Sequence, residues 1–78
     1  MKRPGIQQIC FTLVRELPYA ATLQELTEAA YRRYLEAGGS HKMRPYVWFY
    51  IQRAIEAGAA FGVVEWDGKT VTPVGERV

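Results

Sequence analysis

The sequence predicts one α+β domain over residues 1–78, in which three helices are followed by a C-terminal β-hairpin. Three patterns predict it. An apolar stripe with the period of a helix lies near the start, a capping-box motif lies further along, and an Asp-Gly pair separates two β-branched runs near the end. A chain of this size buries only about 60% of its unfolded surface, which is enough for one small core.

The first helix is expected within the segment "GIQQICFTLVREL" (residues 5–17), where Pro4 and Gly5 precede its apolar stripe and Pro18 ends it. Its apolar residues recur every three or four positions and therefore form one stripe that faces a core. This stripe consists of Ile6, Ile9, Cys10, Leu13, Val14 and Leu17. Phe11 lies off the stripe, so it is either covered by another segment or exposed. Cys10 is expected to be a buried small hydrophobe and not a reactive thiol.

A second helix is expected after a short link at residues 19–21, a segment that can form one small edge strand. In "TLQE", Thr22 can accept a hydrogen bond from an N–H of the first turn, and Glu25 can reach back to the N–H of Thr22. This capping box predicts that the helix starts directly after Thr22. Its inner face is expected to hold Leu23, Leu26, Ala30 and Tyr34.

The sequence also predicts an ion pair on the surface of this helix and the position of its end. Glu28 and Arg32 are four residues apart, in the order that favours an ion pair on a helix. Gly38 and Gly39 are expected to end the helix, because glycine readily adopts the left-handed conformation that follows a last helical turn. In the turn "GGSHKMR" that follows, His41 is expected to be exposed.

A third helix is expected over about residues 45–57, with Pro45 in its first turn and Gly58 as its stop. On a helical wheel, one side collects the core residues Val47, Ile51, Ala54 and Ile55. Trp48 and Tyr50 flank this side and are expected to brace the helix against its neighbours. The outward side collects Tyr46, Phe49, Gln52, Arg53 and Glu56.

Residues 61–74 predict a β-hairpin that turns at Asp67-Gly68. This pair favours a two-residue type I′ turn. The resulting register would place Trp66 opposite Lys69 at the tip, Val64 opposite Val71 and Phe61 opposite Val74. Pro73 and Gly75 would end the second strand.

This order of elements resembles the winged helix-turn-helix superfamily. The stretch "TLQELTEAAYRRYLEAGGSHKMRPYVWFYIQRAIEAG" is similar to that fold's second helix, turn and recognition helix, and "VTPVGERV" is similar to the phrase that often follows its wing. The resemblance implies a DNA-binding domain with a recognition helix at about 45–57 and a wing at 61–74. The turn between the helices is longer than the superfamily's tight turn. No dimerisation helix follows "TPVGERV", so a dimer would use another surface.

Double-stranded DNA is therefore the expected partner, as for a small transcriptional regulator. A recognition helix reads the major groove with its outward face. Arg53 can pair with guanine and Gln52 with adenine, while Phe49 can touch a thymine methyl group.

Phosphate contacts are expected on either side of that face. The Tyr46 hydroxyl suits phosphate oxygens, and Lys42 and Arg44 precede or begin the helix, whose N-terminus attracts phosphate. The resemblance implies that Lys69 in the wing reaches the DNA backbone or the minor groove. Lys2 and Arg3 either form a flexible basic arm or, as is more common for a short charged N-terminus, are simply solvated. The full candidate set is Lys42, Arg44, Tyr46, Phe49, Gln52, Arg53 and Lys69.

Two alternatives stay open. Phe49 is unusual on a DNA-reading surface and Glu56 repels phosphate, so Tyr46 and Phe49 can instead dock a protein partner. Phe11 adds a further aromatic that would suit the seam of a homodimer. Alternatively, Tyr46, Phe49 and Tyr50 can stack on the bases of single-stranded DNA or RNA.

Other classes of function are not expected. The chain has one His, one Cys and one Asp, which are too few for a Cys/His metal site, and no catalytic group of residues is apparent. We expect no enzyme activity, no cofactor and no small-molecule ligand. Apolar runs fall far short of the ~20 residues that span a membrane, and the lone cysteine favours the cytoplasm. The absence of Asn fits a thermophilic source as well as a mesophilic one.

Overall fold

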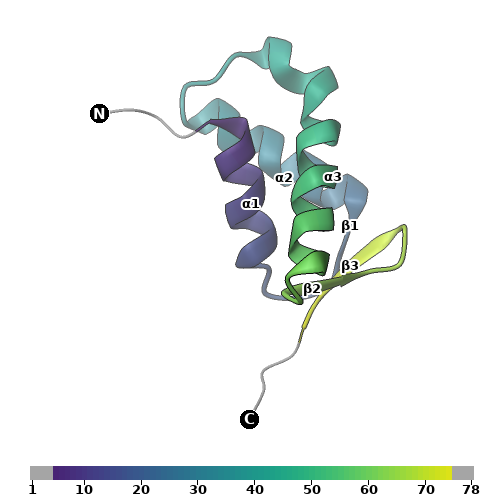
Figure 1. Cartoon of the computed structure of the whole chain (residues 1–78). Helices are drawn as coiled ribbons and strands as arrows, with labels where there is room; N and C mark the ends of the chain where they lie inside the picture. Colours follow the sequence, from purple (N-terminus) through teal and green to yellow (C-terminus); the bar gives the residue numbers. More distant parts are fainter. Residues whose placement is uncertain (1–4, 75–78) are drawn as a thin grey trace.

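The computed structural model describes residues 5–74 and has the predicted α+β architecture of three helices, a small sheet and a C-terminal hairpin. The elements in order are α1 (Ile6–Arg15), β1 (Ala21–Thr22), α2 (Leu23–Glu36), the single 3₁₀ turn η1 (His41–Met43), α3 (Arg44–Ala60), β2 (Val64–Trp66) and β3 (Thr70–Pro73). In Figure 1, α1 and α3 stand side by side with α2 behind them, and the hairpin lies beside the C-terminal part of α3.

The stripe predicted for α1 is confirmed, since Ile6, Ile9, Cys10, Leu13 and Val14 are all buried. The helix ends at Arg15, two residues before the expected limit. Leu17 lies outside the helix, but its N–H still donates to the carbonyl oxygen of Val14 at 3.3 Å and its side chain packs on the core. Phe11 is 38% exposed, as its position off the stripe predicted.

Both ends of α2 are built as predicted. The Thr22 hydroxyl accepts from the N–H of Glu25 at 3.1 Å, and the Glu25 carboxylate accepts from the N–H of Thr22 at 2.9 Å. At the other end Gly38 has φ +93°, and the N–H of Gly39 donates to the carbonyl oxygen of Tyr34 at 2.9 Å. A side chain at Gly39 would overlap the Tyr34 ring unless that ring moved, so the two glycines suit this turn for different reasons.

The predicted end of α3 at Gly58 is wrong, because the helix continues to Ala60. The true stop is Gly62, which has φ +78°. The N–H of Val63 donates to the carbonyl oxygen of Gly58 at 2.8 Å, and the N–H of Gly62 donates to that of Ala59 at 3.1 Å, which together form a Schellman cap. The helix tolerates Gly58 because strong helix formers, Ala57, Ala59 and Ala60, surround it.

Gly58 instead serves close packing. A Cβ atom built there would lie 3.0 Å from Cγ1 of Val14 in α1 and 3.2 Å from Cγ2 of Val64 in β2. These distances are shorter than ordinary van der Waals contact. The missing side chain therefore allows α1, α3 and the hairpin to meet at one point.

The three strands form an antiparallel sheet in the order β1-β3-β2. The edge strand expected near residues 19–21 is present as Ala21–Thr22, with Thr22 opposite Thr70. Pro73 ends β3, as predicted. In β3, β1 pairs only with Thr70 and Val71, so the missing N–H of Pro73 removes no hydrogen bond between β1 and β3. Gly75 lies outside the described residues.

The predicted hairpin register is wrong. Trp66 pairs with Val71 and Val64 pairs with Pro73, while Phe61 belongs to the end of α3 and not to a strand. The turn is longer because Asp67 stabilises it: its Oδ1 atom accepts from the N–H of Lys69 at 2.9 Å and of Thr70 at 2.7 Å. The two-residue shift leaves Val64 and Val71 on the same buried face, because side chains alternate with a period of two.

One core joins all of these elements. The α3 residues predicted to face it are confirmed, since Val47, Ile51, Ala54 and Ile55 are at most 1% exposed. The core consists of Ile6, Ile9, Cys10, Leu13, Val14, Leu26, Ala30, Val47, Ile51, Ala54, Ile55, Val64 and Val71.

Candidate nucleic-acid interface

The outward side of the first half of α3 is open to solvent. Tyr46 and Phe49 are each 57% exposed, and Arg53 is also exposed. Together with Tyr50 and with Gln7 of α1, these side chains line a shallow cleft of about 490 Å³. The structure therefore brings three of the seven predicted site residues, Tyr46, Phe49 and Arg53, to one surface.

Arg44 has structural contacts that the sequence did not predict. Its Nη2 atom lies 3.3 Å from Oε2 of Glu28, and its guanidinium carbon lies 5.0 Å from the centre of the Tyr31 ring. The Tyr31 hydroxyl in turn donates to the carbonyl oxygen of His41 at 3.5 Å. Glu28 thus pairs with Arg44 of α3, where the sequence had suggested Arg32. Arg44 ties the start of α3 to α2, which leaves it less available for phosphate.

Lys42 and Gln52 do not line the cleft. Lys42 is exposed in η1, directly before α3, where its N–H donates to the Ser40 hydroxyl at 3.1 Å. Gln52 is half-buried. Lys42 is therefore the more accessible of the two predicted contacts.

Lys69 lies at the hairpin tip, on a different element from the rest of the set. It is exposed, and the hydrogen bonds to Asp67 fix the backbone on both sides of its side chain. Trp66 was predicted to share the tip, but it is half-buried and packs against the core. Lys69 is thus presented by a turn whose shape is set by hydrogen bonds.

The two aromatic residues expected to brace α3 behave differently. Tyr50 is half-buried and packs against the core, as predicted. Trp48 is 44% exposed, so the prediction that it braces the helix is wrong. Its ring instead meets the Phe49 ring edge-on, with centres 5.2 Å apart and planes at 73°. Trp48 and Phe49 therefore form an exposed aromatic pair.

Charge on the described residues is balanced. Of the ten Lys and Arg residues, Lys2, Arg3 and Arg77 lie outside residues 5–74, as does Glu76 of the eight acidic residues. Seven residues of each sign remain, and Glu76 and Arg77 cancel, so the net charge of +2 comes from Lys2 and Arg3 at the N-terminal end. Any electrostatic attraction for phosphate must come from local groups of cations.

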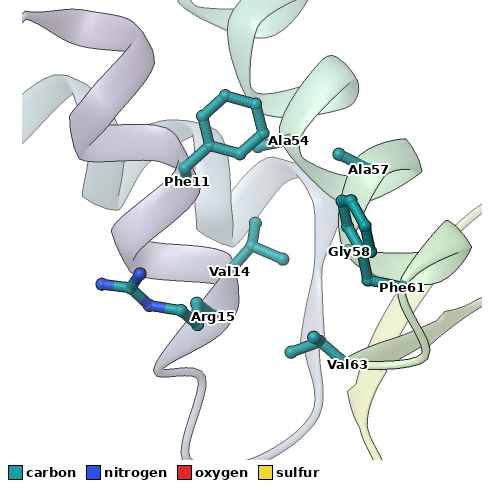
Figure 2. A pocket seen from close by; sticks show the side chains of 8 residues that line it. All are labelled: Phe11, Val14, Arg15, Ala54, Ala57, Gly58, Phe61 and Val63. Carbon is teal, nitrogen blue, oxygen red and sulfur yellow. The ribbon is translucent and has the colours of Figure 1, made fainter.

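A second groove lies between α1 and the C-terminal end of α3 (Figure 2). It has a volume of about 220 Å³. Its lining residues are Phe11, Val14, Arg15, Ala54, Ala57, Gly58, Phe61 and Val63. Phe61 is 85% exposed. The groove was not predicted from the sequence, because Phe61 was expected to lie in a strand of the hairpin. A helix continued past Gly58 would have revealed it, because Phe61 then falls one turn after Ala57 on the same side.

The Cys10 thiol lies fully inside the core. Burial raises the pKa of the Cys10 thiol to about 12, so the thiol is protonated at neutral pH. Within residues 5–74, no group of three or more His, Cys, Asp and Glu is arranged to hold a metal ion. None of the helices described is both long and apolar enough to cross a membrane.

In comparisons with known proteins, no family model, curated protein or solved structure matches the chain.

Proposed function

We propose that the chain is a small double-stranded DNA-binding module, in the manner of a winged-helix regulator. The observation that carries the proposal is the exposed side of α3 at Tyr46, Phe49 and Arg53, presented by a helix that packs on α2 and is followed by a hairpin with Lys69 at its tip. A major groove about 12 Å wide admits an α-helix.

Each side chain has a role that fits its position. Arg53 would donate to a guanine edge, and Phe49 would contact a thymine methyl group. The Tyr46 hydroxyl and the Lys42 and Lys69 ammonium groups would contact phosphates. Arg44 would act indirectly, because its contacts with Glu28 and Tyr31 hold the start of α3 in place.

The balanced charge limits the strength of this binding. Lys42, Arg53 and Lys69 are three cations that can face the duplex, and each phosphate neutralised contributes about −0.9 to the slope of log K against log[salt]. We therefore expect a slope of about −2.7. Affinity for random duplex DNA should fall by about 40-fold between about 50 and 200 mM salt.

The test is a salt-titrated anisotropy measurement with a labelled random duplex. Arg53→Ala should weaken binding and reduce the slope by about 1. The matched control is Arg33→Ala, which removes the same charge from the groove between α1 and α2 and should leave both quantities unchanged. Duplex binding that is absent at low salt, or that both variants weaken equally, would contradict the proposal.

A second candidate function is docking of a protein partner on the same side of α3. The exposed contact between Trp48 and Phe49 favours it, because solvent-exposed aromatic clusters are frequent at protein interfaces. In that case Phe49→Ala would abolish binding of the partner and salt would have little effect on it. The salt titration therefore separates the two candidates.

A further inference from the structure

We propose that two copies of this chain pair through the groove between α1 and the C-terminal end of α3, here called the Phe61 groove, with the eight lining residues given above. This inference does not rest on the proposed DNA binding, because no lining residue of the groove belongs to the set proposed to contact DNA. Phe61 follows Arg53 by eight residues, which is about 12 Å along the helix axis.

The shape of the groove combines a ridge with a hollow. Figure 2 shows the Phe11 ring at one edge and the Phe61 ring at the other, with Val14 between them and with Ala57 and Gly58 next to the Phe61 ring. Gly58 has no side chain and Ala57 has a single methyl group, so the floor is low. A projecting ring therefore stands beside a hollow formed by small residues.

The backbone at Phe61 is also held in a fixed position. Its N–H donates to the carbonyl oxygen of Ala57 at 3.0 Å, and the hydrogen bonds from Gly62 and Val63 close the helix end directly after it. A ring on an ordered backbone loses less entropy on binding than a ring on a mobile loop. Its 85% exposure thus provides a preorganised apolar contact.

A second copy is the occupant that this shape fits. In a two-fold dimer the same patch meets itself, so that residue i contacts residue j and residue j contacts residue i. A surface suited to this arrangement needs both a projection and a hollow. The Phe61 ring of each copy would enter the hollow above Ala57 and Gly58 of the other.

The charge of the groove favours an apolar partner. Arg15 is its one charged lining residue, and Figure 2 shows its guanidinium pointing away from the floor. That side chain is 70% exposed and lies 3.8 Å from the Glu16 carboxylate. Pairing should therefore depend little on salt, in contrast to DNA binding.

The available area sets the strength of the dimer. A phenylalanine buries about 150–250 Å², so the exposed parts of Phe11 and Phe61 offer about 200–300 Å² per copy. A standard interface needs about 800 Å² per partner. Flanking atoms would supply part of the rest, which places this dimer among small, reversible interfaces with a dissociation constant in the micromolar range or weaker.

The test is sedimentation of the free protein from about 1 µM to about 1 mM, without DNA. The native chain should show a concentration-dependent shift from monomer to dimer that high salt leaves in place. Phe61→Glu should weaken dimerisation at least about tenfold. The side chain is so exposed that this variant should keep the native circular dichroism spectrum and melting temperature.

Two further variants make the result specific. Phe49→Glu changes another exposed phenylalanine of the same helix and should leave dimerisation unchanged. Ala57→Gln fills the hollow and should weaken it as Phe61→Glu does. A native chain that stays monomeric at the highest concentration would overturn the proposal and leave the groove to a different partner. An equal effect of Phe49→Glu and Phe61→Glu would overturn it as well.

Discussion

Residues 44–53 and residues 54–63 of the α3 region bury the same kind of side chain and expose different ones. The first part exposes large aromatic rings and a cation, with Arg44 as its tie to α2. The second part exposes one ring above small residues, and a backbone cap closes it. The difference follows from packing: in the second part Gly58 lies against both α1 and β2, whereas the first part is joined to α2 by the Arg44–Glu28 ion pair.

This contrast suggests that the two parts of α3 bind different kinds of partner. Side chains that project into solvent suit a polar, grooved partner such as duplex DNA. A hollow between two rings suits an apolar partner of matching shape. The two proposals use different side chains of one helix, because no residue that lines the Phe61 groove belongs to the set proposed to contact DNA.

A larger side chain at Gly58, in the second part of α3, should lower the free energy of unfolding more than the other changes proposed below. Gly58→Val places methyl groups where Val14 and Val64 already approach within about contact distance, and we expect the free energy of unfolding to fall by about 1–3 kcal/mol. The control is Ala59→Val at the next, exposed position, which should cost only about 0.5 kcal/mol from helix propensity. Urea denaturation measures both. Equal losses would show that the second part is not the more tightly packed one.

Removing the Arg44 contacts between the start of α3 and α2 should lower the free energy of unfolding by a smaller amount. Arg44→Ala loses an exposed ion pair and an exposed cation–π contact, so we expect a loss of about 0.5–1 kcal/mol that high salt reduces. Arg53→Ala serves as the matched control, and its stability should change by less than about 0.5 kcal/mol. In DNA binding the order should reverse, with Arg53→Ala the more damaging. If Arg44→Ala leaves stability unchanged, Arg44 is not the tie described above.

The smallest effect concerns the hairpin that presents Lys69. Hydrogen bonds from the N–H groups of Thr70 and then of Lys69 lower the pKa of the exposed Asp67 carboxyl below its usual range. A lowered pKa in the folded state means that the carboxylate stabilises the turn above about pH 4 and that this support is lost as the pH falls through the folded pKa. Carboxyl and amide NMR shifts in an acid titration measure it.

The matched variant for this titration is Asp67→Asn, which keeps an oxygen acceptor and removes the ionisation. Its hairpin amide shifts should be insensitive to acid. An Asp67 carboxyl that titrates at or above the usual aspartate pKa would show that the turn is not held in this way.

The sequence predicted the helices and the core well, because both depend on patterns within a few residues. The period of Val47, Ile51, Ala54 and Ile55 sufficed to identify the buried side of α3. The capping box at Thr22 and the glycine stop at Gly38 depend on equally local chemistry.

Errors arose where a distant neighbour decides. Gly58 looks like a helix stop, and only its contacts with Val14 and Val64 show that it lies inside the helix. Asp67-Gly68 favours a two-residue turn. The turn is nevertheless longer, because the Asp67 carboxylate accepts hydrogen bonds from the N–H groups of Lys69 and Thr70. Within the candidate site, the exposure of Tyr46, Phe49 and Arg53 followed from the wheel, whereas the ion pair of Arg44 requires knowledge of where α2 lies.

The burial of Cys10 has a practical consequence for studying the molecule. The native thiol is inaccessible and protonated near neutral pH, so it should resist both air oxidation and maleimide dyes. A cysteine introduced on the surface would then be the single labelling point on an otherwise unaltered chain. Spin labels or fluorophores attached there can report distances within a dimer or to a DNA end without first removing the native thiol.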